Sequence, residues 1–198
     1  HIEKDAEVLF SDNPKDYLPV VFSRFEGMEL MNYSSLIYAN KCENVAISGE
    51  GKLNGQGESW DKWNDGQDAA ALRLYDMAES SVPVEKRIFG TEQDSLRPSF
   101  IQFVNCKGIS ISGVTPINGP MWTIQLLYSE NIKISDIKIN SIGHNTDGIV
   151  VDSSKNVVIE NSIFETGDDC ISIKSGLDAD GWRVNRPSEN IIIRDCTM

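Results

Sequence analysis

A short pattern of aliphatic and polar positions recurs five times along this chain of 198 residues. Each copy reads small residue, any residue, Asn or Gly, Val or Ile, any residue, Ile, any residue, and then Gly, Asp or Asn. The two aliphatic residues of a copy lie two positions apart, so they face the same side of a β-strand. The Asn or Gly before them suits a tight bend with a left-handed backbone. The pattern therefore predicts five short strands that are each entered through a bend.

The spacing of these copies indicates a solenoid. The second aliphatic residue of each copy is an isoleucine, and consecutive ones are 64, 23, 25 and 34 residues apart: Ile47, Ile111, Ile134, Ile159 and Ile193. A period in the low twenties, filled with short strands, is typical of stacked repeats. Leucine-rich repeats share this length, but their scaffold of leucine and asparagine is absent. We therefore expect an all-β parallel β-helix in which residues 1–198 form part of a single domain and these isoleucines stack in one interior row.

The interval of 64 residues leaves room for an insertion, which we place at residues 59–98. Its alanine-rich stretch from Gln67 to Glu79 favours a helix. We expect this inserted loop and helix segment to cover one flank of the solenoid. Trp60 and Trp63 lie in the same segment, and the sequence leaves open whether they pack inside the protein or form a platform for a sugar.

Charge and cysteine usage narrow the class of protein. The formal net charge of −12 argues against nucleic acid or an anionic membrane as a partner. The chain begins at His1 without a visible signal sequence, so either a leader has been removed or the chain starts inside a longer protein. The four cysteines show no C-x-x-C spacing, which argues against a zinc site: Cys42, Cys106, Cys170 and Cys196. We expect them to be free, buried thiols rather than disulfides.

Three carboxylates in two short clusters are the candidate chemistry. Asp147 lies 21 residues before Asp168, which is followed by Asp169. Because this separation is close to one coil, we expect all three on one face of the solenoid. Like charges raise the pKa of at least one carboxyl, and an acid that keeps its proton beside ionised carboxylates can hydrolyse a glycosidic bond. Polar turn residues and a calcium site are the alternatives.

The motifs around these acids resemble those of glycoside hydrolase family 28, the polygalacturonases. Asn145-Thr146-Asp147 and Gly167-Asp168-Asp169 carry the resemblance, supported by Arg97-Pro98-Ser99 and by the run from Asp169 to Gly176. The segment from Asp178 onward resembles bacterial members often described as exo-acting. The resemblance implies a right-handed parallel β-helix and inverting hydrolysis of galacturonic-acid-containing pectic polysaccharide, with no metal or other cofactor. It also implies a secreted or periplasmic protein.

The resemblance further implies a role for individual residues. Asp168 is the expected general acid, and Asp147 and Asp169 are expected to hold and activate the water. Substrate contacts are expected from four more residues: Asn145, Lys174, Arg183 and His144. For His144 a structural role is an equal alternative. The family's next signatures, Gly-His-Gly and an Arg-x-Lys that binds the substrate carboxylate, are expected beyond Asp195. This chain is therefore expected to lack part of the substrate-binding site.

Two other functions remain open at the level of sequence. A β-elimination lyase on a similar β-helix would use calcium and an arginine base, with the acids as metal ligands. A non-catalytic β-helix would serve as a carbohydrate-binding or adhesion module. The oligomeric state is left open as well.

Overall fold

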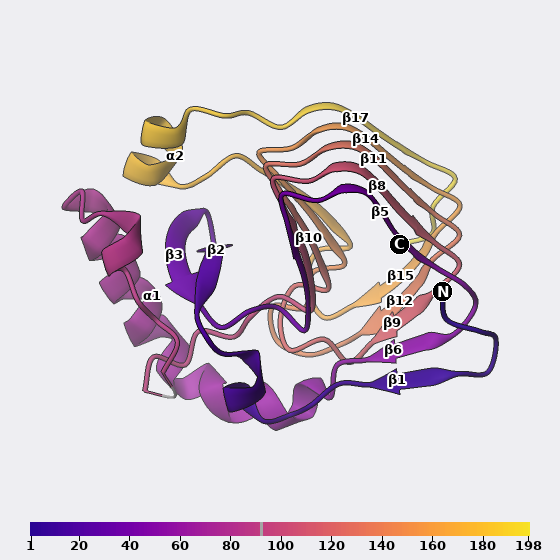
Figure 1. Cartoon of the computed structure of the whole chain (residues 1–198), viewed down its shortest axis with the longest axis horizontal. Coiled ribbons are helices and arrows are strands. Elements are labelled where there is room, and N and C mark those ends of the chain that lie inside the picture. Colours follow the sequence, from indigo (N-terminus) through magenta and orange to yellow (C-terminus); the bar gives the residue numbers. More distant parts are fainter. Residues whose placement is uncertain (92) are drawn as a thin grey trace.

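The chain winds into a parallel β-helix whose coils nest behind one another (Figure 1). The structure is a computed structural model and describes residues 1–91 and 93–198. One sheet contains β1 (Glu7–Leu9), β6 (Lys52–Asn54), β9 (Thr115–Ile117), β12 (Lys138–Ser141) and β15 (Ile163–Thr166). A second contains β4 (Ile37–Asn40), β7 (Ile101–Val104), β10 (Ile124–Leu127), β13 (Ile149–Asp152) and β16 (Ile171–Lys174). The third contains β5 (Glu43–Ser48), β8 (Lys107–Ser112), β11 (Glu130–Ser135), β14 (Lys155–Glu160) and β17 (Glu189–Arg194).

The third sheet consists of the five repeated segments, and its register confirms the predicted stacking. Ile47 pairs with Ile111, Ile111 with Ile134, Ile134 with Ile159, and Ile159 with Ile193. The three middle isoleucines are fully buried in the main hydrophobic core. The fold is thus the right-handed parallel β-helix expected from the repeat and from the family resemblance, and parallel crossovers of this kind are right-handed in nearly all proteins.

The bends that lead into these strands have the predicted left-handed backbone. The Asn or Gly of each copy has a φ angle between +53° and +72°: Asn44, Gly108, Asn131, Asn156 and Asn190. The Asn156 amide donates to the Asn131 side chain at 3.0 Å, and the Asn190 amide donates to Asn156 at 3.1 Å. Asn tolerates this conformation better than most residues, and the stacked amides satisfy one another's hydrogen bonds.

Segments outside the solenoid cover the outer face of the second sheet. They are an antiparallel hairpin of β2 (Val21–Phe25) and β3 (Met28–Asn32), the helix α1 (Asn64–Glu79) and the short helix α2 (Asp178–Val184). The described residues also form 3₁₀ helices at η1 (Pro14–Tyr17), η2 (Gly57–Trp63) and η3 (Val84–Lys86). The hairpin lies between α1 and the sheet that contains β10 (Figure 1). Leu30 of the hairpin, Leu74 of α1 and Val150 of β13 belong to one buried cluster, so these layers are packed together.

The structure answers the question that the sequence left open about the two tryptophans of the insertion. Trp60 and Trp63 are 1% and 4% exposed, and their rings pack edge to face at 5.0 Å. Tyr17 and Tyr33 complete this aromatic cluster. Both tryptophans are therefore part of the core between η2 and the N-terminal segment, and neither is available to stack on a sugar.

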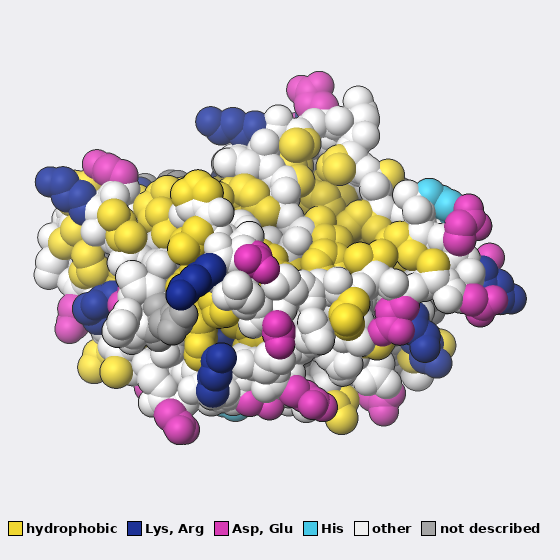
Figure 2. All heavy atoms as spheres, turned by 60° about the horizontal axis from the view of Figure 1, so that its bottom comes forward, with side chains coloured by type: hydrophobic (Ala, Val, Ile, Leu, Met, Phe, Trp, Pro, Cys, Tyr) yellow, Lys and Arg dark blue, Asp and Glu magenta, His cyan; other side chains and the backbone are white. Residues whose placement is uncertain are grey.

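Hydrophobic side chains gather in one broad area of the face shown in Figure 2. The end coil that contains β4 and β5 has core residues that are only partly buried, among them Ile37, Val45 and Ile47. All four cysteines are free thiols; Cys106 is buried and the other three are partly buried. Across residues 1–91 and 93–198, no helix has the length and apolar character needed to cross a membrane.

Candidate active site

The predicted acids lie where two neighbouring strands of the second sheet begin. Asp147 comes just before β13, and Asp168 and Asp169 come just before β16. The Gly148 N–H donates to the Asp169 carbonyl at 2.9 Å, which sets the two coils side by side at this point. A Cβ atom at Gly148 would lie 2.4 Å from the Cys170 carbonyl oxygen, so only glycine permits this close approach. The structure therefore brings the three acids together on adjacent coils.

These acids share a pocket of about 310 Å³, which we call the acid pocket. Its lining side chains come from the solenoid, the hairpin and the segment before α2: Glu26, Trp122, Asn145, Asp147, Asp168, Asp169, Lys174 and Leu177. Five of these eight residues were expected from the sequence to form the site. The arrangement provides clustered carboxylates with a single lysine among the described lining residues.

Asp147 is the buried member of the acid cluster. Its side chain is 3% exposed, and its carboxylate accepts a hydrogen bond from the Ser172 hydroxyl at 2.8 Å. Burial raises the pKa of Asp147 to about 6, while the Ser172 hydrogen bond and the Lys174 charge oppose the rise. The charges of Asp168 and Asp169 add to the rise. The sequence predicted that like charges would raise the pKa of at least one carboxyl; at Asp147 such charges contribute, but burial is the larger cause.

Asp168 and Asp169 are exposed at the mouth of the acid pocket. The Asp169 N–H donates to the Asp168 carboxylate at 2.9 Å. The Thr166 hydroxyl donates to the Asp168 carbonyl at 2.7 Å, which holds the turn that carries the pair. Both carboxylates are thus accessible to a molecule that enters from solvent.

Lys174 contacts the ring of Trp122, which also lines the acid pocket. Its ammonium nitrogen lies 5.1 Å from the centre of the Trp122 ring, within the range of a cation–π interaction. Lys174 was expected to share the face of Ser172 because the two are separated by one strand position, and both side chains do face Asp147. Its positive charge favours the ionised form of Asp147.

Glu26 is a fourth carboxylate in the acid pocket, and sequence reasoning missed it. It occupies the turn between β2 and β3 with a φ of +46°, and its side chain is exposed. The Leu177 N–H donates to the carbonyl of the next residue, Gly27, at 3.1 Å, which docks the hairpin tip on the segment before α2. Surrounding protein atoms raise the pKa of Glu26, and Lys174 opposes this effect. No local motif marks this position, because only the docking of the hairpin brings it to the acids.

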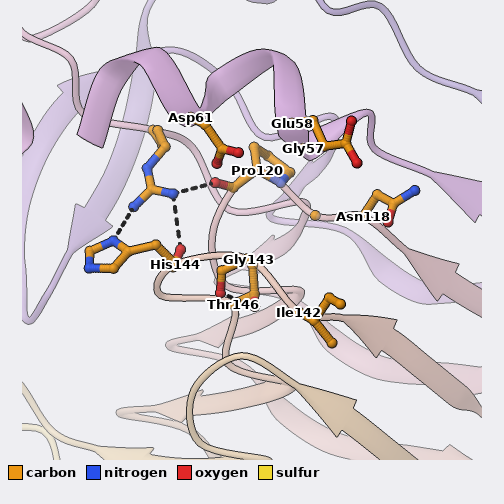
Figure 3. Close-up of a pocket in the computed structure, with 11 residues that line it drawn as sticks. Gly57, Glu58, Asp61, Asn118, Pro120, Ile142, Gly143, His144 and Thr146 are labelled. Atoms are coloured by element: carbon orange, nitrogen blue, oxygen red, sulfur yellow. Dashed lines mark hydrogen bonds between the residues drawn. The ribbon is translucent and has the colours of Figure 1, made fainter. Parts of the chain in front are cut away.

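Arg97 is a second residue whose contribution the sequence did not reveal. Its side chain is 1% exposed and donates to the carbonyls of Pro120 and His144 at 3.0 and 2.9 Å. It also donates to the Asn145 side chain at 2.9 Å and approaches His144 Nδ1 at 3.2 Å. Because arginine can only donate, His144 Nδ1 accepts and its proton sits on Nε2. In Figure 3, dashed lines mark these hydrogen bonds where they reach the labelled residues His144 and Pro120.

A second pocket of about 230 Å³ is bordered by Arg97, Pro120 and His144, and we call it the Arg97 pocket (Figure 3). It lies between η2, the turn after β9 and the loop after β12. His144 lines this pocket and is exposed. It is not among the residues that line the acid pocket. Asn145, the next residue, lines the acid pocket instead.

Arg183 does not line the acid pocket, which corrects the expectation from the sequence. It belongs to α2, where its guanidinium pairs with Glu29 at 2.5 Å and with Asp180 at 3.1 Å. The helix turns this side chain toward the hairpin, so Arg183 joins the hairpin to α2.

Among the described residues, no group of three or more His, Cys, Asp or Glu side chains is arranged to hold a metal ion.

The amino-acid sequence is similar to those of known polygalacturonases. The chain is 30% identical over 204 aligned residues to a probable polygalacturonase from Vitis vinifera, covering 99% of this chain and 36% of that protein. It is 26% identical to an exo-poly-alpha-D-galacturonosidase from Dickeya chrysanthemi, covering 93% of this chain and 34% of that protein. The chain thus spans little more than a third of the length of these relatives.

A solved structure gives a closer match. The hyperthermoactive exopolygalacturonase from Thermotoga maritima superposes with a TM-score of 0.94 at 45% identity, covering 98% of this chain and 47% of that one. The family model for glycosyl hydrolases family 28 matches residues 85–197, which include the acid pocket's solenoid residues. The chain belongs to glycosyl hydrolases family 28.

Proposed function

We propose that this chain carries the acid centre of an inverting glycosidase that cleaves galacturonic-acid-containing pectic polysaccharide. The observation that carries the proposal is the convergence of Asp147, Asp168 and Asp169 in one open pocket beside Lys174. Clustered carboxylates in different environments are the equipment for acid–base hydrolysis of a glycosidic bond. The names of the polygalacturonase relatives support the substrate class.

In this mechanism, Asp168 gives its proton to the glycosidic oxygen as the bond from that oxygen to the anomeric carbon breaks. Asp147 and Asp169 hold a water molecule, whose oxygen attacks the anomeric carbon from the opposite face. The proton of that water passes to one of these two carboxylates. The exposure of Asp168 at the mouth suits an acid that must reach the leaving oxygen, and the buried position of Asp147 suits a group that holds the water.

The raised pKa of Asp147 sets the condition for its role. Asp147 accepts a proton only in its ionised form, and burial moves its pKa to about 6. The water-holding pair is therefore complete only above this pH. Lys174 keeps the ionised form accessible and is available to contact an anionic sugar.

We further propose that the protein acts outside the cytoplasm, as a secreted or periplasmic enzyme on a polymer too large to cross a membrane. The similarity to the Thermotoga exopolygalacturonase supports cleavage at a chain end. The family match to hydrolases does not favour the calcium-dependent lyase or the non-catalytic binding module.

An Asp168→Asn substitution in the intact protein tests the role of the acid. Asn keeps the size of the side chain and can still accept the Asp169 N–H, but it has no transferable proton. We expect turnover of polygalacturonate to fall by at least about 100-fold in kcat, with the dissociation constant of the substrate changed little. Initial-rate kinetics and equilibrium binding of the inactive variant measure the two effects.

Asp136→Asn is the matched control, because Asp136 is an exposed carboxyl that does not line the acid pocket. It should retain full activity. An Asp168→Asn enzyme with near-normal kcat would show that Asp168 is not the acid.

A further inference from the structure

The side-chain oxygen of Asn145 accepts hydrogen bonds from two donors. Arg97 Nη2 donates to Asn145 Oδ1 at 2.9 Å, and Gln67 Nε2 donates to the same atom at 3.0 Å. Gln67 lies in α1 and Arg97 in the segment before β7, so both donors come from outside the strands of the solenoid. Both donors are buried, with 3% and 1% of their side chains exposed.

These contacts determine which way each amide points. A guanidinium has only N–H donors, so the atom that faces Arg97 must be an acceptor. Arg97 Nε donates to Gln67 Oε1 at 2.8 Å, which leaves the Gln67 amino group to donate to Asn145. Arg97 therefore orients the Asn145 amide directly and also through Gln67.

Arg97 keeps its N–H donors although its side chain is buried. Its pKa is lowered to about 10 by desolvation, so the guanidinium stays protonated at neutral pH. Within residues 1–91 and 93–198 it forms no ion pair, and its hydrogen bonds go to neutral oxygens and one ring nitrogen. The charges of Asp61 and Glu26 favour the protonated form of Arg97, but among the described residues neither carboxylate forms an ion pair with it. The guanidinium therefore directs its donors at the loop that carries His144 and Asn145.

The loop that carries Asn145 is held on both sides. The Thr146 hydroxyl donates to the Gly143 carbonyl at 2.7 Å, and the Thr123 N–H donates to the Asp147 carbonyl at 2.7 Å. Asn145 itself has a left-handed backbone with a φ of +55°. Its side chain lines the acid pocket, and no hydrogen bond from its amino group to another described residue is present.

We propose that Arg97 and Gln67 are positioning residues that lock the Asn145 amide, so that its amino group donates hydrogen bonds to an oxygen of the sugar bound in the acid pocket. This inference rests on the proposed function, since it assigns a role in substrate binding at the same site. It gives α1 a part in recognition beyond covering the solenoid. It also gives a role to the buried arginine that borders the Arg97 pocket.

An Asn145→Asp substitution in the intact protein separates this role from a structural one. Asp keeps the two accepted hydrogen bonds and gives Arg97 a counter-ion, so the melting temperature should be unchanged or higher. Asp has lost the amino group, so kcat/KM for polygalacturonate should fall about 10–100-fold, chiefly through a higher KM. Unchanged kcat/KM in a folded Asn145→Asp enzyme would overturn the proposal.

Two further variants test whether the positioning residues act through Asn145. Gln67→Met removes the second donor but keeps the shape of the side chain, and it should raise KM about 2–10-fold. Gln102→Met is the matched control, because Gln102 is a buried amide bonded to Ser23 and Gln125 instead. It should leave KM unchanged, whatever it does to stability.

The double variant Gln67→Met/Asn145→Asp completes the cycle. If Gln67 acts through Asn145, the double variant should have nearly the KM of Asn145→Asp alone. Independent effects that multiply in the double variant would overturn the positioning role. An active Asp168→Asn enzyme, in contrast, would refute the proposed function itself and so is distinguishable from either outcome.

Discussion

At Asp147, burial and hydrogen bonding act in opposite directions on the same carboxyl. Desolvation raises its pKa to about 6, while the Ser172 hydroxyl and the Lys174 charge favour ionisation. Because Asp147 must be ionised to hold the water, its pKa sets the lower pH limit of activity in our account. The acid limb of the kcat/KM profile of the free enzyme is therefore expected near pH 6.

Replacing Ser172 by Ala should move this limb in a definite direction. The Ser172 hydroxyl donates to the ionised carboxylate at 2.8 Å, so its loss destabilises the charged form and raises the pKa of Asp147 further. The acid limb should shift to higher pH, with activity recovered at alkaline pH. Ser99→Ala is the control, because the buried Ser99 hydroxyl donates to Gln125 instead of a carboxylate. An unmoved or lowered acid limb in Ser172→Ala would contradict the assignment.

The sequence predicted the acids and Lys174 but not the residues that complete their surroundings. Asp147, Asp168 and Asp169 were identifiable because one coil separates them and their motifs are distinctive. Gln67 meets Asn145 across 78 residues of sequence, and Glu26 reaches the pocket from a hairpin tip. Such contacts depend on the docking of segments outside the repeat, which no local pattern records. Arg183 was misplaced for the same reason, since α2 turns it toward Glu29.

The strands and bends of the third sheet were predictable because each copy of the repeat contains both the strand pattern and the bend residue. Alternation of aliphatic residues selects the buried face, and Asn or Gly provides the left-handed bend. The helix predicted from Gln67 to Glu79 begins three residues earlier, as α1 at Asn64, directly after η2. Alanine-rich composition indicates a helix interior, whereas this start depends on the preceding 3₁₀ turn.

The bend at Asn156 offers a test of what the asparagines contribute. Asn156→Ala removes two exposed amide hydrogen bonds and also forces Ala into a φ near +57°. Asn156→Gly loses the same bonds without the strain. We expect the Ala variant to have a lower free energy of unfolding than the Gly variant by about 1 kcal/mol, measured by denaturant titration. Equal stabilities would mean that the left-handed bend is not a source of strain here.

The whole molecule combines a periodic scaffold with a non-periodic cover. The stack of coils could be predicted because each rung contacts the next in the same way, as the paired isoleucines show. The hairpin is placed by single contacts between distant segments, such as the buried ion pair of Arg24 with Asp152 at 2.7 Å. α2 is joined to the cover by Asp180, which pairs with Arg87 at 2.6 Å. The scaffold aligns the acids on adjacent coils, and the cover supplies Glu26, Gln67 and Arg97 around them.

The stereochemistry of the reaction tests the central claim most directly. Proton NMR of the intact protein acting on polygalacturonate would identify the anomer released first, before mutarotation mixes the two forms. A water held by Asp147 and Asp169 attacks from the face opposite the leaving group, so our account predicts an inverted anomeric centre. A retained anomer would require a covalent intermediate on a carboxylate and would contradict the water-holding role of these two residues.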